Sequence, residues 1–123
     1  MTRGRPDQRG AATVLTIAMA GVLLLVGAAA TVVGAMVVAH RRAQAAADLA
    51  ALAGAASLAD PTAPSGGGRD PCAVAGQVAA ANRARLRSCR IESADVLVEV
   101  VVTGPHWLGQ VHDLTAAARA GPG

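Results

Sequence analysis

The sequence predicts an α+β, single-pass membrane protein. A long N-terminal helix should extend out of the membrane, and a small domain of one helix and a two- or three-stranded antiparallel sheet should follow it. Three observations lead to this prediction. Residues 11–39 contain no charged residue, Asn, Gln or Pro. Strong helix formers continue to residue 59. After residue 85 the apolar pattern changes from a helical period to alternation.

Residues 11–39 are expected to cross a lipid bilayer. At about 1.5 Å per residue, a helix of this length exceeds the roughly 30 Å of the hydrocarbon core. A chain of 123 residues with one Trp and no Tyr or Phe has too little material to enclose such a helix on every side. The run is also longer than the roughly 7 to 15 apolar residues of a cleaved signal, so we expect a retained anchor.

Small residues recur along one side of this helix. We call them the small-residue stripe, which consists of Ala20, Gly27, Ala30, Thr31 and Gly34. Small side chains let two helix backbones approach closely in lipid. The stripe is therefore a candidate surface for packing against another membrane helix. The alternative is that Ala and Gly are simply frequent throughout this chain.

The flanks of the span are basic on both sides. Residues 1–10 are expected to form a basic cytoplasmic tail. Arg41 and Arg42 follow the span, so the positive-inside rule alone does not give the orientation.

Outside the membrane, the helix is expected to continue to residue 59, giving one long helix over residues 11–59. Leu49, Leu52 and Ala56 recur there at helical spacing and form a candidate outer packing surface. An apolar face this narrow does not stabilise an isolated helix, so we expect something to pack against it.

Residues 60–70 are rich in Pro and Gly and predict a linker to a small domain at residues 71–123. Asp70 and Pro71 supply an N-cap acid and a Pro at the first helical position. The helix that follows should present one apolar face, formed by Val74, Val78 and Ala81.

Two strands should follow this helix. Residues 86–92 alternate in polarity and residues 95–102 form a β-branched run, with Ser93–Ala94 as the hairpin turn. Gly104–Pro105 should end the second strand.

The C-terminal part is less clear. Residues 105–109 are predicted to be a loop that carries Trp107. Residues 111–120 are rich in Ala, which suits a helix, but their position after two strands favours a third, edge strand.

Cys72 and Cys89 are the only cysteines, and both follow the span. A disulfide needs their Cα atoms within about 7 Å, so the second helix must end near residues 82–85 and the chain must double back along it. Two cysteines fit a disulfide outside the cytoplasm better than a metal site, which needs more ligands. The bridge would constrain the unfolded chain by roughly 3 kcal/mol. We therefore expect a cytoplasmic N-terminus and an extracytoplasmic C-terminal domain.

No residue pattern predicts catalysis, a cofactor, a metal or a small-molecule substrate. His40, His106 and His112 lack the helical spacing or the cysteine partners of a metal site. No Ser lies in a G-x-S-x-G motif, and no Gly-rich segment has a phosphate-binding pattern. The net charge of +3 raises the question of nucleic acid. A single aromatic residue and the absence of any zinc-finger or helix-turn-helix pattern argue against it.

A run of arginines at positions 83, 85, 87 and 90 permits two interpretations. It can be a solvated face, which is the ordinary explanation, or it can meet an anionic surface or partner.

Two segments carry a likeness to a known family. RGAATVL at 9–15 and AHRRAQAAADLAALAGAA at 39–56, with one apolar helix between them, resemble the N-terminal region of the TadE-like and TadG-like proteins of Flp/Tad pilus assembly. The most specific part is AAADLAALAGA, and the likeness covers residues 9–59. The short cysteine-bearing remainder is similar to the short TadE-like form of high-GC Gram-positive bacteria.

The resemblance implies a non-enzymatic, minor pilin-like or accessory membrane subunit of a Flp-type pilus or a related secretion machine. Such a subunit works with a secretion ATPase and an inner-membrane platform protein. Prepilin-like members carry an acid about five positions after the processed glycine, whereas Leu15 stands there relative to Gly10. Cleavage after Gly10 and entry into a filament therefore stay open. The alternative function is a membrane-tethered envelope-binding module that uses the Arg83–Arg90 run.

Overall fold

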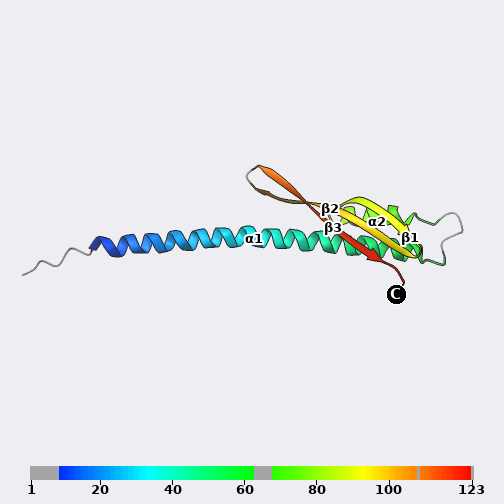
Figure 1. Cartoon of the computed structure of the whole chain (residues 1–123), viewed down its shortest axis with the longest axis horizontal. Coiled ribbons are helices and arrows are strands. Elements are labelled where there is room, and N and C mark those ends of the chain that lie inside the picture. Colours follow the sequence, from blue (N-terminus) through cyan, green and yellow to red (C-terminus); the bar gives the residue numbers. More distant parts are fainter. Residues whose placement is uncertain (1–8, 63–67, 108, 123) are drawn as a thin grey trace, which may run out of the picture. The chain divides into compact units, whose positions relative to one another are not determined.

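The computed structural model describes residues 9–62, 68–107 and 109–122. The chain divides into two compact units, Met1–Ala35 and Met36–Gly123, which are taken in turn. The first element, α1 (Arg9–Leu58), contributes to both units (Figure 1). Its bounds agree closely with the predicted long helix.

The described residues of the first unit are residues 9–35 of α1, which include most of its apolar part. An 18-residue window of α1 has a mean hydropathy of 2.6, and none of its residues is buried. Leu24 and Leu25 are 75% and 73% exposed. A row of large apolar side chains without protein neighbours suits lipid rather than water as its surroundings. Length and composition make α1 the one candidate membrane span among the described residues.

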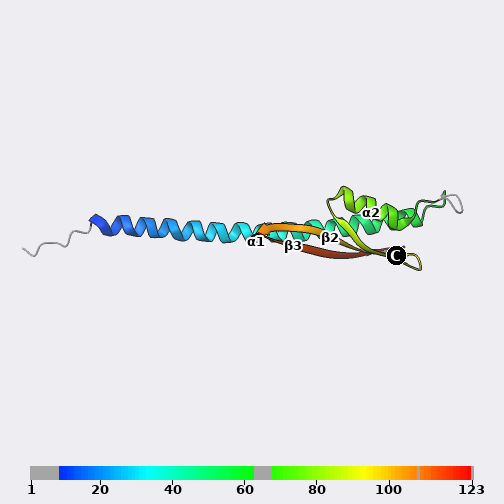
Figure 2. The same ribbon diagram turned by 90° about the horizontal axis from the view of Figure 1, so that it is seen from above.

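The second unit places two helices against a three-stranded sheet. It contains residues 36–58 of α1, followed by α2 (Pro71–Ala81), β1 (Arg85–Glu92), β2 (Asp95–Trp107) and β3 (Gln110–Ala120). The strands are antiparallel and follow each other in sequence order. Figures 1 and 2 show α2 and the strands alongside the C-terminal part of α1. This arrangement confirms the predicted α+β class.

One face of the sheet forms the core with the two helices. Alternate residues of β2 point to that face and are buried: Val96, Val98, Val100 and Val102. The facing side of α1 is built from alanines, all at most 1% exposed: Ala43, Ala46, Ala47, Ala50 and Ala51. We call this side of α1 the alanine face. Because alanine has only a methyl group, the helix backbone lies close to the sheet.

The helix α2 begins as the sequence predicts. The carboxylate of Asp70 accepts a hydrogen bond from the backbone N–H of Cys72 at 3.0 Å, and Pro71 occupies the first turn. The predicted apolar face was wrong, because Ala75 and Ala79 are the buried residues.

Close packing against α1 explains that difference. A Cβ atom built on Gly54 would lie 3.5 Å from the Cβ atom of Ala75. So short an approach leaves room for methyl groups and not for larger side chains. Val74 and Val78 are therefore only partly buried, and Ala81 is exposed.

The hairpin turn at Ser93–Ala94 is confirmed, since Glu92 pairs with Asp95. Ser93 has a φ of 61°, which such a two-residue turn requires.

The predicted strand end at Gly104–Pro105 was wrong. Of the predicted loop at residues 105–109, residues 105–107 belong to β2 and Gly109 lies in a turn, while residue 108 lies outside the described residues. β2 continues to Trp107, which pairs with Gln110. The register shifts between Thr103 and His106, so the ladder is irregular where Pro105 has no N–H to donate. The sheet therefore accommodates the Gly-Pro pair without ending. The preferred assignment of residues 111–120 as a strand is confirmed by β3.

Candidate functional site

The Cys72–Cys89 disulfide joins the first turn of α2 to β1, with 5.7 Å between the Cα atoms. The chain doubles back because α2 ends at Ala81 and Arg83 adopts a φ of 58°. The N–H of Ala84 then donates to the carbonyl of Ala79 at 2.9 Å. The predicted bridge and the early end of the second helix are both confirmed.

The small-residue stripe lies on the exposed part of α1. Cβ atoms built on Gly27 and Gly34 would meet nothing within 4 Å. The hydroxyl of Thr31 donates to the carbonyl of Ala28 at 2.7 Å, so it is satisfied within the helix. Both glycines therefore leave open space beside the α1 backbone.

The predicted outer packing residues of α1 lie away from the sheet. Leu49 and Leu52 are 47% and 61% exposed, and Ala56 is also exposed. Within this chain the alanine face packs against the sheet instead. The outer part of α1 thus has two apolar faces: the buried alanine face, and the exposed face with Leu49, Leu52 and Ala56 that the sequence predicts.

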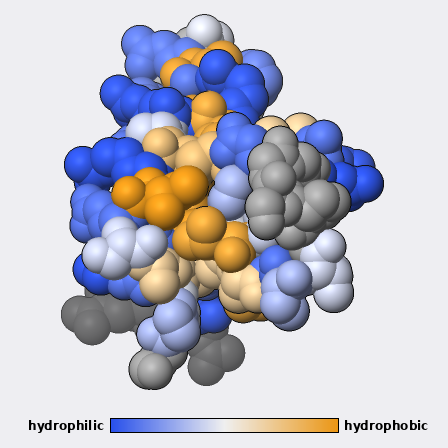
Figure 3. Space-filling model, turned by 90° about the vertical axis from the view of Figure 1, so that its right-hand side faces the viewer, coloured by the Kyte–Doolittle hydropathy of each residue, from blue (hydrophilic) through white to orange (hydrophobic). Residues whose placement is uncertain are grey.

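Exposed apolar side chains also occur at the end of the second unit where α1 terminates. Seen from that end, they form a patch bordered by hydrophilic residues (Figure 3). Leu58 and Ile91 are 38% and 44% exposed.

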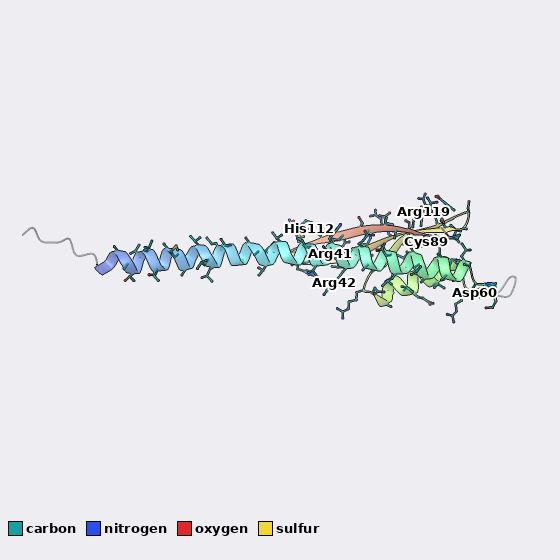
Figure 4. The ribbon with its side chains drawn as sticks, turned by 90° about the horizontal axis from the view of Figure 1, so that it is seen from below. Arg41, Arg42, Asp60, Cys89, His112 and Arg119 are labelled. Atoms are coloured by element: carbon teal, nitrogen blue, oxygen red, sulfur yellow. A yellow bond between two sulfur atoms is a disulfide. The ribbon has the colours of Figure 1, made fainter. Side chains whose placement is uncertain are left out.

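Most arginines of the sheet have a carboxylate partner. The pairs on the open face and edges of the sheet are Arg85–Asp113 at 3.6 Å, Arg87–Glu99 at 3.5 Å and Arg90–Glu92 at 4.0 Å. Arg119 binds Asp95 through two guanidinium nitrogens, Nε at 2.7 Å and Nη2. The hydrogen bond to Asp95, and next its charge, raise the pKa of Arg119 above its ordinary value. Figure 4 places Arg119 on the sheet and Asp60 beyond the end of α1.

These pairs divide the arginine run into two parts. Arg85, Arg87 and Arg90 are compensated by acids, although each exposed pair adds little stability. Arg83 makes no ion pair within 4 Å in the described part of the chain. This division is not visible in the sequence, because two of the three acids come from β2 and β3.

Arg83 lies on an open groove of about 630 Å³ between both helices and β2. We call it the arginine groove. It is lined by Arg42, Ala45, Ala46, Ala81, Asn82, Arg83, Val102 and Thr103. None of these residues is acidic, and Arg42 also lacks an ion pair within the described residues.

A second hollow, of about 320 Å³, lies on the open face of the sheet. It contains Arg90, Arg119 and Glu99, each of which has an ion-pair partner. The arginine groove is therefore the more strongly electropositive of the two.

Titratable side chains elsewhere are mostly exposed. His, Cys, Asp and Glu do not gather in any group of three or more that could hold a metal, as far as the described residues go. Asp60 follows α1, and its carboxylate accepts hydrogen bonds from the hydroxyl and N–H of Thr62 at 2.6 and 2.9 Å. These bonds lower the pKa of Asp60 below its ordinary value.

Comparison with known proteins identifies one region of similarity. Residues 10–57 match the model of a family described as putative Flp pilus-assembly TadE/G-like. The matched region lies within α1 and ends before the linker. No curated protein and no solved structure matches the chain. The resemblance stated from the sequence is thus confirmed at the level of this family model.

Proposed function

We propose, from the TadE/G-like match of residues 10–57, that this chain is a non-enzymatic membrane subunit of Flp-type pilus assembly or a related secretion machine. We propose further that it is of the short TadE-like form and acts as a minor pilin-like or accessory subunit. The observation that carries it is the match itself, because it coincides with a helix whose apolar part has no protein neighbours.

The proposed topology has residues 1–10 in the cytoplasm and the second unit outside the cytoplasmic membrane. The Cys72–Cys89 disulfide supports this orientation, since disulfides persist in oxidising compartments. The basic flanks on both sides of the span do not decide between the two orientations.

In the proposed mechanism, α1 makes two kinds of contact with neighbouring subunits. The small-residue stripe packs on other membrane helices, because Gly27 and Gly34 allow close approach of a second backbone. Leu49, Leu52 and Ala56 meet neighbouring subunits outside the membrane, where their exposure leaves them available.

The stripe is tested by replacing Gly27 and Gly34 together with Leu and crosslinking the full chain in intact membranes. Neither new side chain would clash within the chain. We expect crosslinks to pilin-like subunits to fall at least about fivefold, since bulky residues separate the helices. Gly21→Leu is the matched control, because Gly21 has equally open surroundings on another side of α1.

An unchanged crosslinking pattern in the double variant would remove the stripe from the mechanism. Failure of the wild-type protein to co-purify with any pilus or secretion subunit in detergent would contradict the proposed function. The envelope-binding alternative is less well supported, because three arginines of its proposed run are already paired with acids.

A further inference from the structure

We propose that the arginine groove binds the phosphate of an anionic phospholipid in the membrane that the chain spans. The proposal rests on the membrane placement in the proposed function. It adds a ligand and a site, with Arg42 and Arg83 as the residues that hold the phosphate.

The groove lies at the right level along α1. The last apolar residues of the span, Met36 to Ala39, belong to the same unit as the groove. Arg42 follows Ala39 by three residues, or about 4.5 Å of helix rise. The polar headgroup region occupies roughly 5 to 8 Å on each side of the hydrocarbon core. With Ala39 at the edge of the hydrocarbon core, Arg42 lies at the depth of the lipid phosphates.

The groove also has the right charge. Arg42 and Arg83 line it, and neither has a carboxylate partner among the residues that the structure describes. A guanidinium group binds phosphate through two parallel hydrogen bonds. Ala45 is exposed beside the arginines, and the core residues Ala46 and Val102 also line the groove. This combination suits a phosphate attached to an acyl chain better than a free ion.

The backbone at Arg83 supplies a variant that tests the site without straining the chain. Its φ of 58° lies in the left-handed region, in the turn that follows the C-cap of α2. Glycine would adopt this conformation without steric strain. Arg83→Gly therefore removes the guanidinium group without straining the backbone.

Native mass spectrometry of the full-length chain in detergent tests the proposal. Equal amounts of phosphatidylglycerol and phosphatidylcholine are added, and the ratio of the two bound lipids is measured. The wild-type protein should retain phosphatidylglycerol in clear excess. Arg42→Gln and Arg83→Gly should each lower that excess about fivefold, the equivalent of about 1 kcal/mol per basic residue.

Arg69→Gln and Arg85→Gln are the charge-matched controls, since neither residue lines the groove. Both should leave the lipid ratio unchanged. Formation of the Cys72–Cys89 disulfide in each variant verifies that the second unit has folded.

Equal retention of the two lipids by the wild-type protein would overturn the proposal. So would equal losses in the groove variants and the controls, or displacement of phosphatidylglycerol by millimolar inorganic phosphate. Release of the wild-type protein from membranes by alkaline carbonate would instead contradict the proposed function itself.

Discussion

At the scale of single residues, the role of each arginine depends on which acid the fold brings to it. Arg85 and Arg83 are two positions apart in the sequence. Arg85 pairs with Asp113 on β3, whereas Arg83 lines a groove that contains no acidic residue. Sequence spacing alone treats the two as one basic run, because it contains no information about which strands become neighbours.

Asp60 gives a prediction about pH at this scale. Its pKa is lowered in the folded chain by the hydrogen bonds from Thr62. The ionised carboxylate therefore stabilises the local Asp60–Thr62 turn above its ordinary pKa of 3.8, and that stabilisation is lost as the pH falls through the lowered value. Thr62→Ala removes the hydroxyl donor and should raise the pKa of Asp60, as measured by carbon-detected NMR of the full chain.

The matched control for that experiment is Thr115→Ala, which removes an exposed hydroxyl on β3. It should leave the titration of Asp60 where it is. An Asp60 titration midpoint that is the same in Thr62→Ala and the wild-type chain would show that the hydroxyl does not stabilise the carboxylate.

At the scale of secondary-structure elements, close packing between α1, α2 and the sheet depends on small residues. A Cβ atom on Gly54 would lie 3.0 Å from Cγ1 of Val96 and 3.1 Å from the carbonyl oxygen of Pro71. On Gly76 of α2 it would lie at an ordinary 3.6 Å from Leu86. The two helical glycines thus differ in surroundings while sharing the same low helix propensity.

We predict opposite effects of substitution at these two glycines. Gly54→Val should destabilise the second unit by about 1 to 3 kcal/mol, because the added atoms overpack the contact with β2. Gly76→Ala should stabilise it by about 0.5 to 1 kcal/mol through helix propensity. Denaturant titration of the full chain, followed by the fluorescence of its only Trp, measures both free energies of unfolding. Destabilisation by Gly76→Ala would contradict the packing described for α2.

At this scale the sequence predicted the order of elements and several of their ends. Asp70 and Pro71 marked the start of α2, and the change of period marked β1. The buried faces of α1 and α2 were not predicted, because the usual signal is a stripe of large apolar residues and these contacts use alanine and glycine. The length of β2 was underestimated because Gly104–Pro105 is a strong strand-ending signal that a register shift can absorb.

At the scale of the whole molecule, the second unit combines a thin core with one covalent link. Its largest fully buried side chains are only valines, Val96 and Val100. A core of this size supplies little hydrophobic stabilisation. The Cys72–Cys89 disulfide therefore contributes a large share of the stability of the unit.

We predict that Cys72→Ala combined with Cys89→Ala lowers the free energy of unfolding of the second unit by about 3 kcal/mol. Denaturant titration of the full chain, with and without reductant, provides the measurement. Reductant should lower the free energy of unfolding of the wild-type protein by a similar amount and should not change that of the variant. A wild-type transition that does not move in reductant would show that the core is sufficient by itself.

Only some of the proposed functional residues could be predicted from the sequence. The two cysteines and the exposed residues of α1 could be named in advance, because each depends on local pattern and compartment. The arginine groove could not, since Arg42, Arg83 and Thr103 come from three elements that meet only in the folded chain.

The order of the three strands has a consequence for how quickly the sheet can form. Each strand pairs with its immediate neighbour in sequence, so every ladder closes through a short connection. Sheets made of such local pairings have low contact order and nucleate rapidly. The pairing of the three strands can thus be completed early in folding, because no ladder waits for a distant segment of the chain.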